Sequence, residues 1–358
     1  MEPKIKIAVI GTGWWSTTAH IPGLLEYKQA DIILIDPNAQ ALQAAAQHYG
    51  LRKTYASLKD ALAAHPDIKG AIVAVPHRFH AEIGREVLES GLHLLIEKPM
   101  TLYAKDARRL VELADERNLH LMVGYFYPHT ELFKEARKRI DDGLVGDVEY
   151  ITCSMTSLTI ELYRGKPEAY DANMPYPVTR PGKNTYSDPA ISGGGQGHLQ
   201  ATHSTGLMFA LAPGLRAEVV TAFMNPLDTR VDVADACAVR MNNGAVATVG
   251  STGNITAGDH GMLEVHLHGS RGRLRIDLSA GEFYMRQHSG QGERVEINGS
   301  PDLGRRSSQR FADLILGKIT NPAPGRDVGL YSVELLDAAY RSAGQGGMPV
   351  TTASLYGD

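Results

Sequence analysis

The chain has 358 residues, of which 43% are hydrophobic and 21% are charged, and its formal net charge is -4. This length suits two domains with a cleft between them, and the slightly acidic balance argues against nucleic acid as a partner. Cys153 and Cys237 show neither a disulfide framework nor a metal-ligand pattern, which fits a reducing compartment. Residues 1–6 run directly into a strand pattern and no apolar run approaches a membrane span, so we expect a cytoplasmic protein without a membrane partner.

The first motif follows a β-branched run at residues 4–10 and leads into a helical pattern. It consists of Gly11, Thr12, Gly13, Trp14, Trp15 and Ser16. A strand, a glycine turn and a helix are typical of a dinucleotide site, because glycines let the backbone approach a pyrophosphate and the helix start holds its negative charge. Ser16 stands where a third glycine is expected, and its small side chain still lets helix and strand pack closely. The alternative is an ordinary turn.

The next strand pattern, residues 31–35, ends at Asp36. An acidic side chain about twenty residues after the glycine turn can accept hydrogen bonds from the adenosine ribose hydroxyls, and it repels a 2′-phosphate. We therefore expect NAD rather than NADP as the cofactor. Asp36 can also cap the helix that begins after residues 37–38, and this role is compatible with binding the ribose.

The rest of the N-terminal part alternates strands and helices. The strand at 70–75 is wholly apolar, as in sheets buried on both faces, so we predict a doubly wound parallel sheet. The remaining elements are expected at helices 39–48, 81–89 and 104–116, at an amphipathic turn around residues 57–64 and at strands 92–96 and 119–123. The two central strands deliver polar groups at their carboxyl ends: Pro76, His77 and His80 after the first, and Glu97, Lys98 and Pro99 after the second.

The glycine turn, Pro76 with His80 and Glu97-Lys98-Pro99 resemble, in their order and placement, the glucose–fructose oxidoreductase / inositol dehydrogenase (Gfo/Idh/MocA) family. The resemblance covers nearly the whole chain. It implies an N-terminal Rossmann domain and a C-terminal α/β domain with a large open, mainly antiparallel sheet. It also implies hydride transfer between NAD(P) and a sugar or polyol hydroxyl. We place the NAD-binding domain at residues 1–124 and the substrate-binding and oligomerisation domain at residues 125–358.

Lys98 is the first candidate catalytic residue, since the carboxyl edge of a parallel sheet is where open α/β folds bind ligands. A partly desolvated ammonium beside an oxidised cofactor would have a lowered pKa and can share a proton with a substrate hydroxyl. The alternative is a surface lysine paired with Glu97. We expect Pro76, His77, His80 and Glu97 to contact the cofactor at the same edge, although His80 can equally open its helix.

Residues 158–192 form a long stretch without periodicity that holds four tyrosines and several basic residues. Such a segment is usually a functional loop, and its tyrosines argue against disorder. Tyrosine suits a carbohydrate ring, while arginine and lysine suit a carboxylate, sulfonate or phosphate on it, so the substrate class includes anionic carbohydrates. A subunit-interface arm is an equally good interpretation. The expected substrate contacts in this part of the chain are Tyr127, Tyr163, Arg164 and Tyr186.

A glycine run at residues 193–197 precedes a helical pattern that continues to residue 211. The resemblance implies an Asp and, four residues on, a His beside the substrate. His203 matches the His and is the second candidate catalytic residue, whereas Leu199 stands where the Asp is expected. His198 is a neighbouring substrate-contact candidate, and a buried structural histidine is the alternative for both. The spacing of His198 and His203 does not stack two ligands on one helix face, so we expect no metal site.

The C-terminal part alternates short strands with turn signals. Strands are expected at 217–223, 234–241, 245–252, 261–269 and 272–278, and helices at 310–316 and 329–343. Antiparallel strands with one covered face give the open sheet that the resemblance implies. We expect its exposed face to form a homodimer or homotetramer.

Three functions fit these features. The first is an NAD-dependent dehydrogenase acting on a secondary hydroxyl of a sugar, polyol or related carbohydrate. The second is a redox glycosidase, in which held NAD transiently oxidises the sugar, elimination cleaves the glycosidic bond and the product is reduced again. It would release the aglycone without net NADH and incorporate solvent deuterium. The third is a non-catalytic NAD-sensing regulator, whose output would not depend on Lys98.

Overall fold

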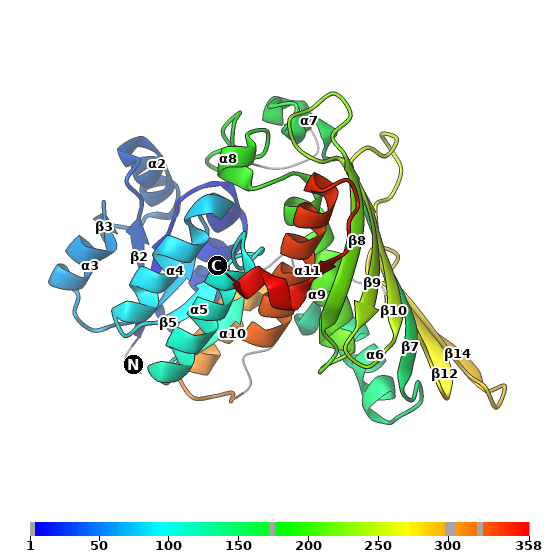
Figure 1. The fold of residues 1–358 in the computed structure, drawn as a ribbon. Helices are drawn as coiled ribbons and strands as arrows, with labels where there is room; N and C mark the ends of the chain where they lie inside the picture. Colours follow the sequence, from blue (N-terminus) through cyan, green and yellow to red (C-terminus); the bar gives the residue numbers. More distant parts are fainter. Residues whose placement is uncertain (1–3, 172–175, 298–304, 321–324, 358) are drawn as a thin grey trace.

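The computed structural model describes residues 4–171, 176–297, 305–320 and 325–357. The N-terminal half of the chain and a large sheet from the C-terminal half lie side by side, with helices between them (Figure 1). Residues 1–3, part of the N-terminal segment in which no leader was expected, lie outside the described residues.

The N-terminal sheet has six parallel strands in the order β3-β2-β1-β4-β5-β6, which is the Rossmann order. Alternate residues of β1, β2, β4, β5 and β6 enter two separate cores, so both faces of the sheet are apolar and these strands are largely continuous hydrophobic runs. The strands are β1 (Ile5–Ile10), β2 (Ala30–Ile35), β3 (Thr54–Tyr55), β4 (Ile68–Val73), β5 (His93–Ile96) and β6 (Leu121–Val123). The predicted doubly wound parallel sheet is confirmed.

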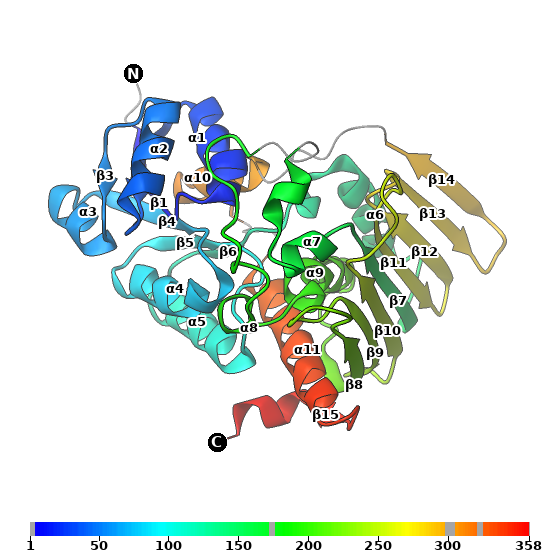
Figure 2. The same ribbon diagram turned by 90° about the horizontal axis from the view of Figure 1, so that it is seen from above.

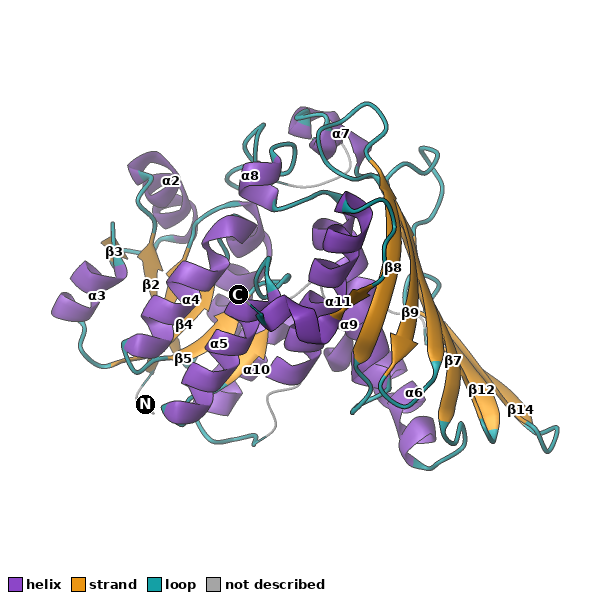
Figure 3. Ribbon diagram, viewed as in Figure 1, coloured by secondary structure: helices purple, strands orange, loops and turns teal. Residues whose placement is uncertain are grey.

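Helices cover both faces of this sheet (Figure 3). The N-terminal helices are α1 (Ile21–Tyr27), α2 (Ala39–Tyr49), α3 (Leu58–Ala64), α4 (His80–Glu89) and α5 (Ala104–Glu116). Helix α10 (Arg305–Ile315) comes from the C-terminal half but packs beside α1 on the N-terminal sheet, where Phe311 and Ala312 are fully buried (Figure 2). The predicted domain boundary at residue 124 follows the end of β6. Helix α10 belongs to the C-terminal side of this boundary in sequence but packs on the N-terminal domain.

The second sheet has nine strands in the order β14-β13-β12-β11-β7-β10-β9-β8-β15. Neighbouring strands are antiparallel except β7 and β10, so the expected large, mainly antiparallel sheet is confirmed. Its strands are β7 (Val148–Thr156), β8 (Ala217–Asn225), β9 (Ala234–Met241), β10 (Val246–Thr252), β11 (Met262–Gly269), β12 (Gly272–Asp277), β13 (Glu282–Gln287), β14 (Gly292–Glu296) and β15 (Val350–Thr351).

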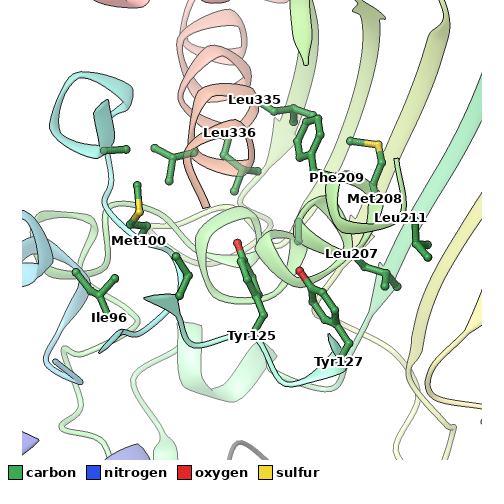
Figure 4. Packing of buried hydrophobic residues seen from close by; sticks show 14 of the residues in the cluster. Ile96, Met100, Tyr125, Tyr127, Leu207, Met208, Phe209, Leu211, Leu335 and Leu336 are labelled. Atoms are coloured by element: carbon green, nitrogen blue, oxygen red, sulfur yellow. The ribbon is translucent and has the colours of Figure 1, made fainter. Parts of the chain in front are cut away.

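One face of this sheet is covered by helices, which are α6 (Glu131–Asp141), α9 (Thr202–Leu211) and α11 (Arg326–Gly344). The core beneath them includes Tyr125, Tyr127, Phe209 and Leu336 (Figure 4). Helix α11 also packs against α5, so it joins the two halves of the molecule. None of the helices in the described part of the chain is long and apolar enough to span a membrane.

Candidate active site

The glycine turn lies between β1 and a helical turn, η1 (Ser16–His20), that continues into α1. Gly11 has φ 90°, and a Cβ there would lie 2.4 Å from the Ala74 carbonyl oxygen. A Cβ on Gly13 would meet no atom within 4 Å, so the space beside its backbone is open. The Ser16 hydroxyl is buried without a partner. An open cradle at a helix start with a spare hydroxyl fits a pyrophosphate.

Asp36 follows β2 and is hydrogen-bonded to the glycine turn. Its Oδ2 accepts hydrogen bonds from Thr12 N at 2.7 Å and Thr12 Oγ1 at 2.9 Å, and its Oδ1 accepts one from Asn38 N at 2.8 Å. Asn38, not Asp36, caps α2, accepting from the next helix N–H groups. Because Asp36 is only half-buried and a carboxylate has about four acceptor sites, ribose hydroxyls can still bind it.

Glu97 joins the end of β5 to the helix after the glycine turn. Its carboxylate is 6% exposed, accepts a hydrogen bond from Trp15 Nε1 at 2.9 Å and lies 2.9 Å from His20 Nε2. It also accepts one from the backbone N–H of Lys98 at 3.1 Å. A Cβ on Gly124 would lie 2.3 Å from its Oε1, which explains the glycine. Through these contacts the Glu97 carboxylate fixes the positions of Trp15, His20 and the Lys98 backbone relative to one another.

The Lys98 ammonium is hydrogen-bonded to the main chain rather than to the Glu97 carboxylate. It donates a hydrogen bond of 2.7 Å to the backbone carbonyl of Leu199, in the π-helical turn η5 (Gly197–Ala201) of the other half of the molecule. Burial lowers the pKa of Lys98 to about 8, and the nearby Glu97 charge only partly opposes this shift. The interpretation of Lys98 as an exposed partner of Glu97 is therefore wrong, because a main-chain carbonyl holds its amine.

The surroundings of the Leu199 side chain are apolar, and they suit a leucine better than a carboxylate. It is 5% exposed and lies in an apolar cluster with Tyr163, Tyr170, Val231 and Val233. Leu199 lies in a π-helical turn, whose spacing departs from that of an α-helix. The group presented to Lys98 is the Leu199 carbonyl.

His203 is near Lys98 and half-buried. Burial and the positive charge of Lys98 lower its pKa well below the ordinary value, so the ring is neutral. Its Nδ1 is buried without a hydrogen-bond partner, and Phe126 lies 5.7 Å away between ring centroids. A neutral imidazole with a free nitrogen beside an amine can accept or orient a hydroxyl group.

His77 and His80 both lie at the end of β4, but they have different contacts. His80 is 1% exposed, and its ring nitrogens lie 2.7 Å from the Pro99 carbonyl oxygen and 2.9 Å from that of Val75. His80 therefore fixes the backbone at Pro99, directly after Lys98. His77 Nδ1 lies 3.0 Å from the Ser192 carbonyl oxygen, in the C-terminal half. Burial lowers the pKa of both rings.

The tyrosine-bearing segment contacts both halves of the molecule. Tyr176 packs edge-on against Trp14, with ring centroids 5.8 Å apart, and Tyr186 lies 6.0 Å from His77. The described part of the segment contains the short helices α7 (Ile160–Tyr163), η4 (Pro167–Tyr170) and α8 (Pro189–Ser192), and it passes beside the N-terminal sheet (Figure 2). Residues 172–175 lie outside the described residues. The contacts of Tyr176 and Tyr186 are with residues of the candidate site, and the subunit-arm interpretation stays a prediction.

Four of the residues predicted to contact the substrate are buried in the core or paired with other side chains. Tyr127 is fully buried in the core, and the Tyr163 hydroxyl donates to Gln196 Oε1 at 2.8 Å. Arg164 pairs with Glu161 of the same segment at 2.6 Å and with Asp228, in the connection between β8 and β9, at 2.9 Å.

His198 is the fourth. It stacks on Tyr340 at 4.3 Å between centroids, and burial lowers its pKa to about 4. The interpretation of His198 as a buried structural histidine fits this position better than substrate contact.

Sequence patterns missed several residues that shape the site. His20 lies within η1, four residues after Ser16, and its place after the glycine turn was an available signal. Gln196, Asp232 and Tyr340 support the glycine run, but they carry no local pattern that distinguishes them. Among the described residues, no group of three or more His, Cys, Asp or Glu side chains is placed to hold a metal ion.

The fold and this edge of the sheet are those of a dinucleotide-binding Rossmann domain. Residues 5–125 match the family model described as "Oxidoreductase family, NAD-binding Rossmann fold". Residues 5–125 are therefore similar to the NAD-binding domain of the Gfo/Idh/MocA oxidoreductases.

Curated relatives include two sugar or polyol dehydrogenases. D-xylose 1-dehydrogenase [NADP(+)] of Haloarcula marismortui is 28% identical over 45% of this chain and 46% of its own length. Inositol 2-dehydrogenase of Corynebacterium glutamicum is 28% identical over 41% of this chain and 44% of its own length. The chain spans less than two thirds of the length of the curated relatives it matches.

A solved structure of similar fold is levoglucosan dehydrogenase in complex with NADH and levoglucosan. It has a TM-score of 0.78 and 19% sequence identity, and the match covers 98% of this chain and 99% of that one. At this identity the likeness concerns the fold of the whole chain.

Proposed function

We propose that this chain is an NAD-dependent oxidoreductase that transfers hydride between a secondary hydroxyl of a carbohydrate and the nicotinamide of NAD. The observation that carries the proposal is the Lys98 amine, buried at the carboxyl end of β5 and hydrogen-bonded to Leu199 O at 2.7 Å. Burial lowers its pKa to about 8, so protonated and neutral amine are both accessible near neutral pH.

The residues around the glycine turn fit NAD. The backbone at Gly13 would approach the pyrophosphate, because no protein atom lies within 4 Å of a Cβ built there. The Ser16 hydroxyl, buried without a protein partner, is available as a further donor. Asp36 would hold the adenosine ribose and repel a 2′-phosphate. When bound, NAD supplies the acceptor for the hydride.

Lys98 and His203 handle the proton. Neutral Lys98 Nζ accepts the proton of the substrate hydroxyl, and the neutral ring of His203 orients that hydroxyl through its free nitrogen. The Leu199 carbonyl fixes the direction of the amine, because a hydrogen-bonded amine has fewer rotamers than a free one. The Tyr186 ring lies beside His77 at the same edge, where it suits one face of a sugar ring.

A carbohydrate substrate agrees with relatives whose names are D-xylose 1-dehydrogenase and inositol 2-dehydrogenase. We do not assign Arg164 to an anionic group of the substrate, because its guanidinium is paired with two carboxylates. The preference for NAD rests on Asp36, while one relative carries NADP(+) in its name.

The test is a panel of aldoses, polyols and inositols, incubated with NAD and separately with NADP and followed by formation of the reduced cofactor. We expect turnover of at least one member with NAD, and tighter binding of NAD than NADP by calorimetry. Absence of turnover together with absence of NAD binding would contradict the proposal.

A further inference from the structure

Asp232, in the connection between β8 and β9, supports the start of the turn that faces Lys98. It is 7% exposed and accepts hydrogen bonds from three consecutive backbone N–H groups of the glycine run. Gly195 N donates to Oδ1 at 2.7 Å, Gln196 N to the main-chain carbonyl at 2.9 Å and Gly197 N to Oδ2 at 2.7 Å. The Tyr340 hydroxyl donates to Oδ1 at 2.8 Å. Asp232 thus fixes the backbone of residues 195–197.

The glycines are required by this close packing. A Cβ on Gly195 would lie 2.0 Å from the Asp232 carbonyl oxygen, and a Cβ on Gly194 or Gly197 would lie 2.2 Å or 2.6 Å from the Tyr340 hydroxyl. Backbone and aromatic groups cannot move aside as the end of a flexible side chain can. Glycine is therefore required at positions 194, 195 and 197, because Asp232 and Tyr340 leave no room for a Cβ there.

Asp235 is a buried neighbour of Asp232, and burial together with the charge of Asp232 raises the pKa of Asp235 well above the ordinary value. The Asp232 carboxylate accepts from N–H and O–H donors, and hydrogen bonds to a carboxylate are stronger than those between neutral groups.

The same backbone leads directly to the candidate catalytic pair. The turn η5 begins at Gly197, presents the Leu199 carbonyl to Lys98 Nζ at 2.7 Å, and continues into α9, which carries His203. A shift at the start of the turn therefore moves both the acceptor of Lys98 and the ring of His203. Displacements on the scale of 1 Å are enough to lower catalytic rates strongly.

We propose that Asp232 is a positioning residue for Lys98 and His203 and acts through the glycine run. The part of this proposal that concerns catalysis rests on the proposed function. The part that concerns the placement of Lys98 does not, and it has its own readout.

The test compares Asp232→Asn with the wild-type protein and with Asp277→Asn. The amide keeps the size of the carboxylate but turns one acceptor into a donor that faces a backbone N–H. Asp277 is a matched control, since it is 7% exposed and accepts from Ser279 N at 2.9 Å and Ala280 N at 3.1 Å in a hairpin of the sheet.

For Asp232→Asn we expect kcat to fall about tenfold while KM for NAD changes by less than about twofold. The second readout is competitive labelling of amines with acetic anhydride, with Lys98 quantified by mass spectrometry of its peptide. Labelling of Lys98 should rise several-fold, because its amine loses a fixed acceptor. Asp277→Asn should leave both quantities unchanged.

Tyr340→Phe is the second variant, since it removes the hydroxyl on Asp232 while keeping the ring that stacks on His198. We expect the same pattern with smaller changes, and this variant decides the matter if Asp232→Asn does not fold. Wild-type labelling of Lys98 in the folded variants would overturn the proposal. If no carbohydrate supports turnover, the proposed function fails, while the labelling result still decides whether Asp232 places Lys98.

Discussion

Lys98 has a neutral main-chain acceptor where a carboxylate was expected, and this changes its acid–base behaviour. A carboxylate at hydrogen-bond distance would favour the ammonium, whereas burial against the Leu199 carbonyl lowers the pKa of Lys98 to about 8. Both candidate proton-handling groups are then available in neutral form, because burial and Lys98 also lower the pKa of His203.

The pH dependence of hydroxyl oxidation follows from this pKa. Only the neutral amine can accept the hydroxyl proton, so kcat/KM should be low below the pKa of Lys98, rise through about 8 and level off above it. The measurement is the rate of NADH formation with the best member of the carbohydrate panel across that range. A profile that falls with rising pH in this interval would contradict the role of Lys98 as base.

The chemistry-bearing residues were predictable where they follow strands, and less so elsewhere. Lys98, Glu97 and Asp36 come directly after apolar runs, so their place at one edge of the sheet could be inferred. Arg164 and Tyr127 could not be assigned in this way, because tertiary contacts with Asp228 and with the core determine where they point. The backbone carbonyl of Leu199 carries no sequence signal.

At the scale of elements, local patterns located the Rossmann domain well. Helix α5 has the predicted bounds, and the glycine turn lies between β1 and a helix as expected. The docking of α10 on the N-terminal sheet was not predictable, because it depends on the space that Gly70 leaves for Phe311. The π-helical turn η5 was also missed, because the sequence was interpreted as an ordinary helix from the glycine run to residue 211.

Gly13→Ala tests the strand–turn–helix unit as a cofactor site. An added methyl group meets no protein atom within 4 Å, so stability should be unchanged, but the methyl would occupy the space where a pyrophosphate approaches. We expect the Kd for NAD, measured by calorimetry, to rise about tenfold or more, given the close backbone approach at such sites.

The control is Gly344→Ala at the end of α11, where a Cβ also meets nothing within 4 Å. It should leave NAD binding unchanged. Equal NAD affinity of Gly13→Ala and the wild-type protein would contradict the location of the cofactor.

At the scale of the whole molecule, the face of the large sheet opposite α9 and α11 bears exposed apolar side chains. Phe223 on β8 is 64% exposed and Val246 on β10 is 50% exposed, and the small Ala236 and Ala238 face out between these strands. An exposed sheet face with such side chains suits sheet-on-sheet packing of two copies. We therefore retain the proposal of a homodimer or homotetramer through this face.

Phe223→Asp tests the assembly. A charge placed in the middle of an apolar interface loses its hydration without gaining a partner, so the variant should sediment as a smaller species than the wild-type protein. Tyr103→Asp is the control, because Tyr103 is 57% exposed in the N-terminal half. A wild-type protein that sediments as a monomer at all concentrations would contradict the assembly.

The most direct test of the account is a single turnover by Lys98→Met beside the wild-type protein, with the protein in excess over NAD. Methionine has a similar length and no proton to exchange, so the account predicts unchanged NAD affinity and a loss of the NADH-forming rate of about 100-fold or more. Asp277→Asn should turn over like the wild-type protein. A Lys98→Met variant that forms NADH at the wild-type rate would contradict the central claim that this lysine handles the proton.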